Sequence, residues 1–121
     1  MAASSQGHAE AVGALVAGGA VVDRRRGDGM TAAYAAACRG HAEALGVLLD
    51  AGADADSAVF SDGSTPLLVA SYNGWTSVAR RLLESGANPK QKSTDGTTPL
   101  FVAAWHGHPA LARTLFAGPR R

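Results

Sequence analysis

Four histidines and one cysteine are the residues of this 121-residue chain that could bind a metal ion or act in nucleophilic chemistry. His8, His41 and His108 each follow a glycine and take equivalent places in successive repeats, which stand about 8–10 Å apart. His106 is two residues from His108. A structural zinc ion needs ligands that converge to about 2 Å from the metal, and side chains two apart on a helix do not face each other. We therefore expect no metal site.

Cys38 is the only cysteine, so it can form no disulfide within the chain. An unpaired cysteine favours a reducing, intracellular setting; we predict the cytoplasm, with the nucleus as the alternative. The longest apolar run, residues 11–22, is too short to span a membrane and is preceded by Glu10 where a signal peptide would carry Lys or Arg. We expect neither a membrane span nor a targeting segment.

The sequence contains no recognisable catalytic set. Catalysis needs a nucleophile, a base and an orienting group within reach of one another, whereas the polar residues of this chain recur at long intervals. The glycine-rich stretch 17–19 also lacks the Lys and the Ser or Thr of a phosphate-binding loop. We predict that the protein is not an enzyme and uses no cofactor.

The one basic run is Arg24-Arg25-Arg26. We expect it to form a solvated loop; the alternatives are a docking patch for an acidic partner and part of a localisation signal. The formal net charge is only +1, and aromatic residues make up 6% of the chain. Because nucleic-acid binding needs more Lys and Arg and more stacking rings, a nucleic acid is not the partner that we expect.

The elements that must position these residues form a repeat. Gly-His or Gly-Trp pairs begin at residues 7, 40, 74 and 107, in steps of 33, 34 and 33 residues. Leucines at 15, 48, 82 and 115 and threonines at 31, 65 and 98 keep the same register. Hydrophobic residues make up 46% of the chain and include no isoleucine, so Ala, Leu and Val favour closely packed helices over a sheet.

Each repeat carries signals for two short helices. Thr65-Pro66 and Thr98-Pro99 supply an N-cap oxygen and a first-turn residue that lacks an N–H, and glycines at 40, 74 and 107 can end the first helix. A second helix follows, and the polar stretch before the next threonine predicts an extended finger. The 34-residue step places one extra residue within 53–62. We expect the turn histidines to bond to local backbone, and Gly46 to lie on an outer face.

These motifs resemble the ankyrin repeat, whose unit of about 33 residues opens with Thr-Pro-Leu-His-x-Ala. Residues 62–70 (DGSTPLLVA) and 95–104 (DGTTPLFVAA) follow that pattern, whereas Ala32 and Ala33 replace the usual Pro and Leu after Thr31. The resemblance covers nearly the whole chain and implies an all-α solenoid of helix-turn-helix units joined by β-turn or hairpin fingers. We expect one domain, 1–121, with a partial unit at 1–23 and units at 24–56, 57–90 and 91–121.

The resemblance also implies a protein–protein interaction module, a scaffold or adaptor that binds another protein through its concave face and finger tips. Residues that differ between units at those positions are the predicted site: Arg39, Tyr72, Asn73, Trp105 and His106 before the turn glycines, and Met30, Asp62, Ser64, Asp95 and Thr97 in the fingers. Stacked first helices would hold Tyr72 and Trp105 about 8–10 Å apart, within reach of one bound segment. The alternative function is a structural spacer or an autoinhibitory segment of a larger protein.

The ends of the chain lack the polar caps that are typical of a solenoid. Only six residues precede Gly7, and the last predicted helix ends in Leu115-Phe116-Ala117. Exposed apolar residues at such ends favour association. We therefore expect either end-to-end self-association or a loosely ordered segment at 1–18.

Overall fold

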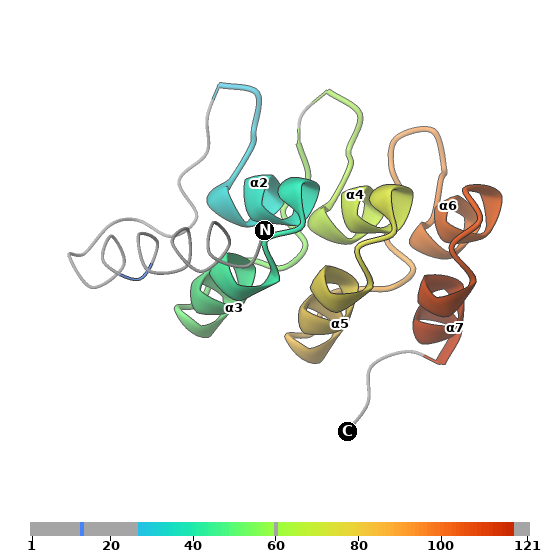
Figure 1. Ribbon diagram of the computed structural model, residues 1–121. Helices are drawn as coiled ribbons and strands as arrows, with labels where there is room; N and C mark the ends of the chain where they lie inside the picture. Colours follow the sequence, from blue (N-terminus) through green and yellow to red (C-terminus); the bar gives the residue numbers. More distant parts are fainter. Residues whose placement is uncertain (1–12, 14–26, 60, 118–121) are drawn as a thin grey trace.

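The computed structural model describes residues 13, 27–59 and 61–117, and over these residues it contains six helices and no strands. The helices form three pairs: α2 (Ala32–Arg39) with α3 (Ala42–Asp50), α4 (Pro66–Asn73) with α5 (Thr76–Glu84), and α6 (Pro99–Trp105) with α7 (Pro109–Ala117). In Figure 1 the first helices of the pairs form one row, the second helices form another, and the fingers between pairs extend beyond the first row. The predicted all-α solenoid is confirmed.

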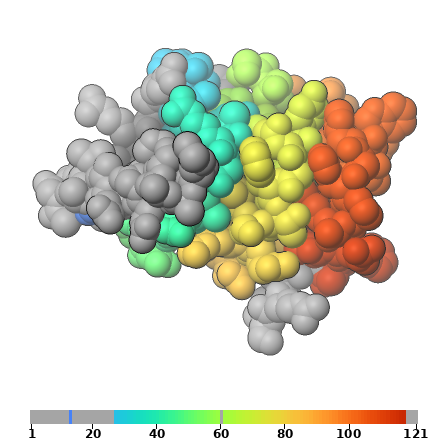
Figure 2. Space-filling view, in the orientation of Figure 1, coloured from blue at the N-terminus to red at the C-terminus, as the bar shows by residue number. Residues whose placement is uncertain are grey.

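The three pairs follow one another in chain order as neighbouring bands across the molecule (Figure 2). Apart from Gly13, the predicted partial unit at 1–23 lies outside the described residues, as does the basic run Arg24–Arg26. The division of the chain into units at 24–56, 57–90 and 91–121 stays a prediction.

The first helix of each pair begins at the predicted threonine. The N–H groups of Tyr34 and Leu68 donate to the hydroxyl oxygens of Thr31 and Thr65, each over 3.2 Å. The N–H of Phe101 donates in the same way to Thr98, over 3.3 Å. Proline occupies the first turn of both α4 and α6. These caps satisfy backbone donors that the helix itself leaves unpaired, so they define where each helix begins.

A continuous apolar core joins the pairs. Leu45, Leu67, Leu82 and Leu111 are completely buried, and so are alanines at 33, 37, 70, 79 and 103. Because alanine is small, the helices can approach closely: α4 contacts both α2 and α6 along one row, and α5 contacts both α3 and α7 along the other. Each pair is therefore stabilised mainly by the pairs beside it.

A ring at the turn of one pair packs on the turn glycine of the pair before it. A Cβ added to Gly40 would lie 2.9 Å from the ring of Trp75, and one added to Gly74 would lie 2.7 Å from the ring of His108. Both glycines also have left-handed backbone, with φ of 75° and 77°. Glycine is thus required at these turns for two separate reasons, its conformation and its lack of a side chain.

The same rings bond to the preceding pair. The indole Nε1–H of Trp75 donates to the carbonyl of Cys38 over 3.2 Å, and Nε2 of His108 lies 3.2 Å from the carbonyl of Tyr72. A carbonyl oxygen only accepts, so His108 is the donor. The prediction that the turn histidines bond to local backbone is wrong for His108, because its acceptor belongs to the neighbouring pair.

The fingers are held by hydrogen bonds from one to the next. Asp62 accepts two bonds at its carbonyl oxygen, one from the N–H and one from the hydroxyl of Thr94, each over 2.9 Å. In the finger before α4, the N–H of Val59 donates to the carbonyl of Ser64. In the finger before α6, the N–H of Ser93 donates to the carbonyl of Thr97, so the loop closed by Val59 and Ser64 is one residue longer. The extra residue of the 34-residue step therefore lies between Val59 and Ser64.

Gly46 does not lie on an outer face, contrary to the sequence-based expectation. It is buried in α3, and a Cβ added to it would meet the guanidinium nitrogen of Arg81, on α5, at 2.2 Å. Gly46 therefore makes room for the long side chain of Arg81, which covers the joint between α3 and α5. Alanine here would gain helix propensity but would displace that side chain.

Leu82→Ala should lower the free energy of unfolding by about 2–5 kcal/mol, because it removes a completely buried side chain from the middle pair. Urea unfolding followed by circular dichroism measures the change. Leu100→Ala, at an exposed leucine of α6, is the matched control and should cost clearly less. Equal losses in the two variants would contradict the described core.

Gly74→Ala should destabilise the protein more than Gly107→Ala. The two residues have nearly the same φ, 77° and 74°, but only a Cβ at Gly74 would meet a ring. The shared left-handed strain is about 1–2 kcal/mol, and crowding against His108 should add about 1–3 kcal/mol at Gly74 alone. Thermal unfolding of both variants measures the difference, and adding His108→Ala to Gly74→Ala should remove most of it. If the two glycine variants are equally stable, the packing of the ring does not constrain Gly74.

Candidate functional site

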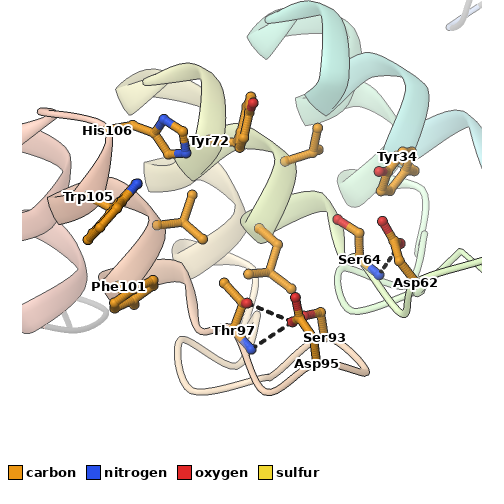
Figure 3. A pocket seen from close by; sticks show the side chains of 13 residues that line it. Tyr34, Asp62, Ser64, Tyr72, Ser93, Asp95, Thr97, Phe101, Trp105 and His106 are labelled. Atoms are coloured by element: carbon orange, nitrogen blue, oxygen red, sulfur yellow. Dashed lines mark hydrogen bonds between the residues drawn. The ribbon is translucent and has the colours of Figure 1, made fainter.

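A groove of about 460 Å³ lies on the face formed by the first helices and the fingers. Its lining comes from α2, α4 and α6 and from the two fingers that precede α4 and α6 (Figure 3). The residues that line it are Tyr34, Asp62, Ser64, Leu68, Val69, Tyr72, Ser93, Asp95, Thr97, Phe101, Val102, Trp105 and His106. We call this set the groove.

Helical periodicity brings the side chains of the groove to one face. Phe101 and Trp105 are four residues apart on α6, and Leu68 and Tyr72 have the same spacing on α4, so the members of each pair lie one above the other. Tyr34 of α2 occupies the position equivalent to Leu68 and Phe101, three residues after the capping threonine. Helices α4 and α6 therefore contribute the same two turns of their surfaces, whereas α2 contributes the first position alone.

Three rings of the groove are more than half exposed: Tyr72 at 58%, Phe101 at 57% and Trp105 at 75%. Trp105 stacks on Phe101, with ring centroids 5.8 Å apart and planes inclined by 21°. Tyr72 contacts His106, the residue that follows α6, with centroids 4.3 Å apart and an angle of 54°. The expected 8–10 Å separation of Tyr72 and Trp105 stays a prediction, but each ring has its own ring neighbour (Figure 3).

The finger side of the groove carries two carboxylates. Oδ1 of Asp62 accepts the N–H of Ser64 over 2.9 Å. Oδ1 of Asp95 accepts the hydroxyl of Ser93, the hydroxyl of Thr97 over 2.6 Å and the N–H of Thr97 over 3.1 Å. The hydrogen bonds from Ser93 and Thr97 lower the pKa of Asp95 to about 2. Asp95 is therefore charged throughout the physiological range.

Tyr34 closes the groove on the α2 side. Its side chain is only 9% exposed, and burial raises the pKa of its hydroxyl, an effect that the nearby charge of Asp62 reinforces. A hydrogen bond with Ser64 acts in the opposite direction. The phenol therefore stays neutral and anchors α2 to the finger of the next pair.

Seven of the ten residues predicted from the sequence lie together in the groove: Tyr72, Trp105, His106, Asp62, Ser64, Asp95 and Thr97. The other three are not among its lining residues. Arg39 is exposed at the end of α2, the amide of Asn73 donates to the carbonyl of Val69, and the N–H of Met30 donates to Asp28 in the first finger.

Sequence reasoning missed the column formed by Tyr34, Leu68 and Phe101. A signal was available, because all three are large and lie at the same distance from their capping threonine. An apolar residue early in a helix is normally read as core, and that reading holds for Leu68, which is buried. Phe101 instead faces the groove.

Within the part of the chain that the structure describes, no three or more His, Cys, Asp or Glu side chains are grouped so that they could hold a metal ion. None of the helices formed by these residues has the length and apolar character needed to cross a membrane. Cys38 is exposed at the end of α2 with a free thiol.

Comparison with known proteins identifies the repeat. A family model described as ankyrin repeats, in three copies, matches residues 1–93 and 48–120 of the chain. These two matches together cover nearly all of the sequence. A search of curated proteins finds no match to the chain.

The carboxyl group of Asp95 should titrate near pH 2, well below the usual range for aspartate, because its hydrogen bonds from Ser93 and Thr97 favour the charged form. A folded-state pKa below the unfolded value means that these bonds stabilise the protein above about pH 4, and that their contribution is lost as the pH falls toward 2. NMR titration of the side-chain carbon measures the pKa. Ser93→Ala with Thr97→Ala should raise it toward the ordinary value; an unchanged pKa would show that the hydroxyls are not its cause.

Proposed function

Because the chain belongs to the ankyrin repeat family, we propose that it is a protein-binding module that holds a segment of its partner in the groove. Ankyrin repeats are generally protein–protein interaction modules, and the family is typically non-catalytic. The proposal assigns binding to the groove as a whole, including the seven predicted residues that line it. A scaffold or adaptor role in the cell is part of the same proposal.

The observation that carries this proposal is the exposure of Tyr72, Phe101 and Trp105 within one groove. Large rings at a surface lose the gain that burial would give them, about 25 cal/mol for each Å² of apolar area. Tyrosine and tryptophan are also the side chains most often found as hot spots of protein interfaces. A partner that covers the three rings would recover that gain.

The fold itself gives little reason for these rings. The position of Tyr72 and Trp105 is occupied in α2 by Cys38, and α2 has the same threonine N-cap as α4 and α6. A small side chain is thus compatible with the helix at this position. Side-chain size at this position increases from Cys38 to Tyr72 to Trp105, which supports a binding role at the α4 and α6 end of the groove.

The spacer or autoinhibitory alternative requires no exposed partner site. Its support is the apolar surface outside the groove, where Phe116 of α7 is 84% exposed. Self-association through the ends of the chain belongs with this alternative and stays a prediction, and its N-terminal segment 1–18 lies, except for Gly13, outside the described residues. An intracellular location, in the cytoplasm or the nucleus, also remains a proposal.

Tyr72→Ser with Trp105→Ser should separate the two functions. Both side chains are largely exposed, so the double variant should lose less than about 1.5 kcal/mol of stability. Binding to a partner captured with the isolated chain should weaken by about 2 kcal/mol or more if the rings are hot spots. Thermal unfolding and isothermal titration calorimetry measure the two effects.

Phe116→Ser is the control, because it removes a ring that is even more exposed and does not line the groove. It should leave partner binding unchanged. If the double variant binds as the parent protein does while Phe116→Ser does not, the groove is not the recognition site and the alternative function gains.

A further inference from the structure

The groove combines aromatic side chains with negative charge. Among the described residues that line it, Asp62 and Asp95 are the acidic ones, His106 is the one histidine, and no lysine or arginine contributes. Arg39 and Lys92 are nearby in the sequence, but both are exposed and neither is part of the lining. The groove therefore offers a partner two carboxylates and no lysine or arginine, although the whole chain carries a formal net charge of +1.

The two carboxylates are held in fixed orientations. Every hydrogen bond recorded for the carboxylates of Asp62 and Asp95 is made by Oδ1, with donors from the same finger. The Oδ2 atom of each is thus available to an external donor. Thr94 bonds to the carbonyl of Asp62, which keeps the two fingers side by side.

The aromatic part of the groove lies next to this acidic part. In Figure 3 Asp62, Ser64 and Asp95 lie along the fingers, Phe101 and Trp105 extend from α6 toward the same space, and Tyr72 and His106 close the far side. The faces of Trp, Tyr and Phe rings attract cations as well as apolar side chains. A volume of about 460 Å³ is within the range of sites for small ligands, so it suits a few side chains of an extended segment.

On the basis of the proposed function, we propose that the groove selects a short, extended segment of a partner protein in which an arginine or lysine lies next to an aromatic or large apolar residue. The cationic head is bound by Oδ2 of Asp62 and Asp95. The neighbouring apolar side chain packs against Tyr72, Phe101 and Trp105. Arginine fits best, because its planar guanidinium can donate to two carboxylates at once.

Charge complementarity distinguishes this occupant from others. An acidic segment would bring like charges together at Asp62 and Asp95, and Asp95 stays ionised far below neutral pH. A neutral apolar segment would cover the rings but would exclude water from the two carboxylates without supplying donors, which is unfavourable. Only a segment that combines a basic residue with an aromatic or large apolar one satisfies both parts of the groove.

A phage-displayed library of random peptides, selected on the full chain, tests the proposal. The selected peptides should share an arginine or lysine within two residues of an aromatic or large apolar residue. A synthetic copy of the strongest binder should bind Asp62→Asn with Asp95→Asn about tenfold more weakly than the parent, because asparagine keeps the Oδ1 acceptor but removes the charge. Trp105→Ala should weaken binding more than tenfold, and added salt should weaken it progressively.

Glu84→Gln is the control, since it removes one negative charge from an exposed position of α5 outside the groove. It should leave affinity for the peptide unchanged. The inference is overturned, and the proposed function stands, if the selected peptides bind in the groove but lack basic residues, or if the double asparagine variant loses no more affinity than Glu84→Gln. Both are overturned if no selected peptide is sensitive to Trp105→Ala.

Discussion

The contact between a turn ring and the turn glycine of the preceding pair is the constraint on which the rest of the structure depends. Trp75 on Gly40 and His108 on Gly74 make the same contact, and each ring also donates to a carbonyl of the preceding first helix. The contact holds the C-terminal ends of α2 and α4, while buried alanines hold the faces along which the first helices pack. Two neighbouring helices so joined can stack in only one register.

The groove is a consequence of that register. Once α4 and α6 are joined at their turns and their fingers are linked through Thr94, side chains at equivalent helix positions must lie beside one another. The aromatic stack of Phe101 on Trp105 and the contact of Tyr72 with His106 use positions that the joints leave free. The exposed rings of Tyr72, Phe101 and Trp105 therefore take no part in the joints, although the backbone carbonyls of Asp62 and Tyr72 do.

The sequence was sufficient to predict the helices, because their signals are local. A threonine cap, a proline in the first turn and a glycine at the end act within a few residues of one another, and the period revealed them. The partner of His108 and the surroundings of Gly46 could not be predicted in this way, since both depend on a residue of the adjacent pair. Seven groove residues were found by comparing units, but Phe101 was missed because its chemistry suits a core as well as a binding face.

The joint between pairs also has a direction. In both joints between the described pairs the ring belongs to the later pair and the glycine to the earlier one, so this part of the array has a polarity like that of a head-to-tail polymer. Trp75 and His108 perform the same task with different chemistry, which shows that the joint requires only a flat ring with an N–H. A duplicated unit that carries this ring and this glycine is compatible with either neighbour, so gene duplication can lengthen such an array while the groove positions diverge independently.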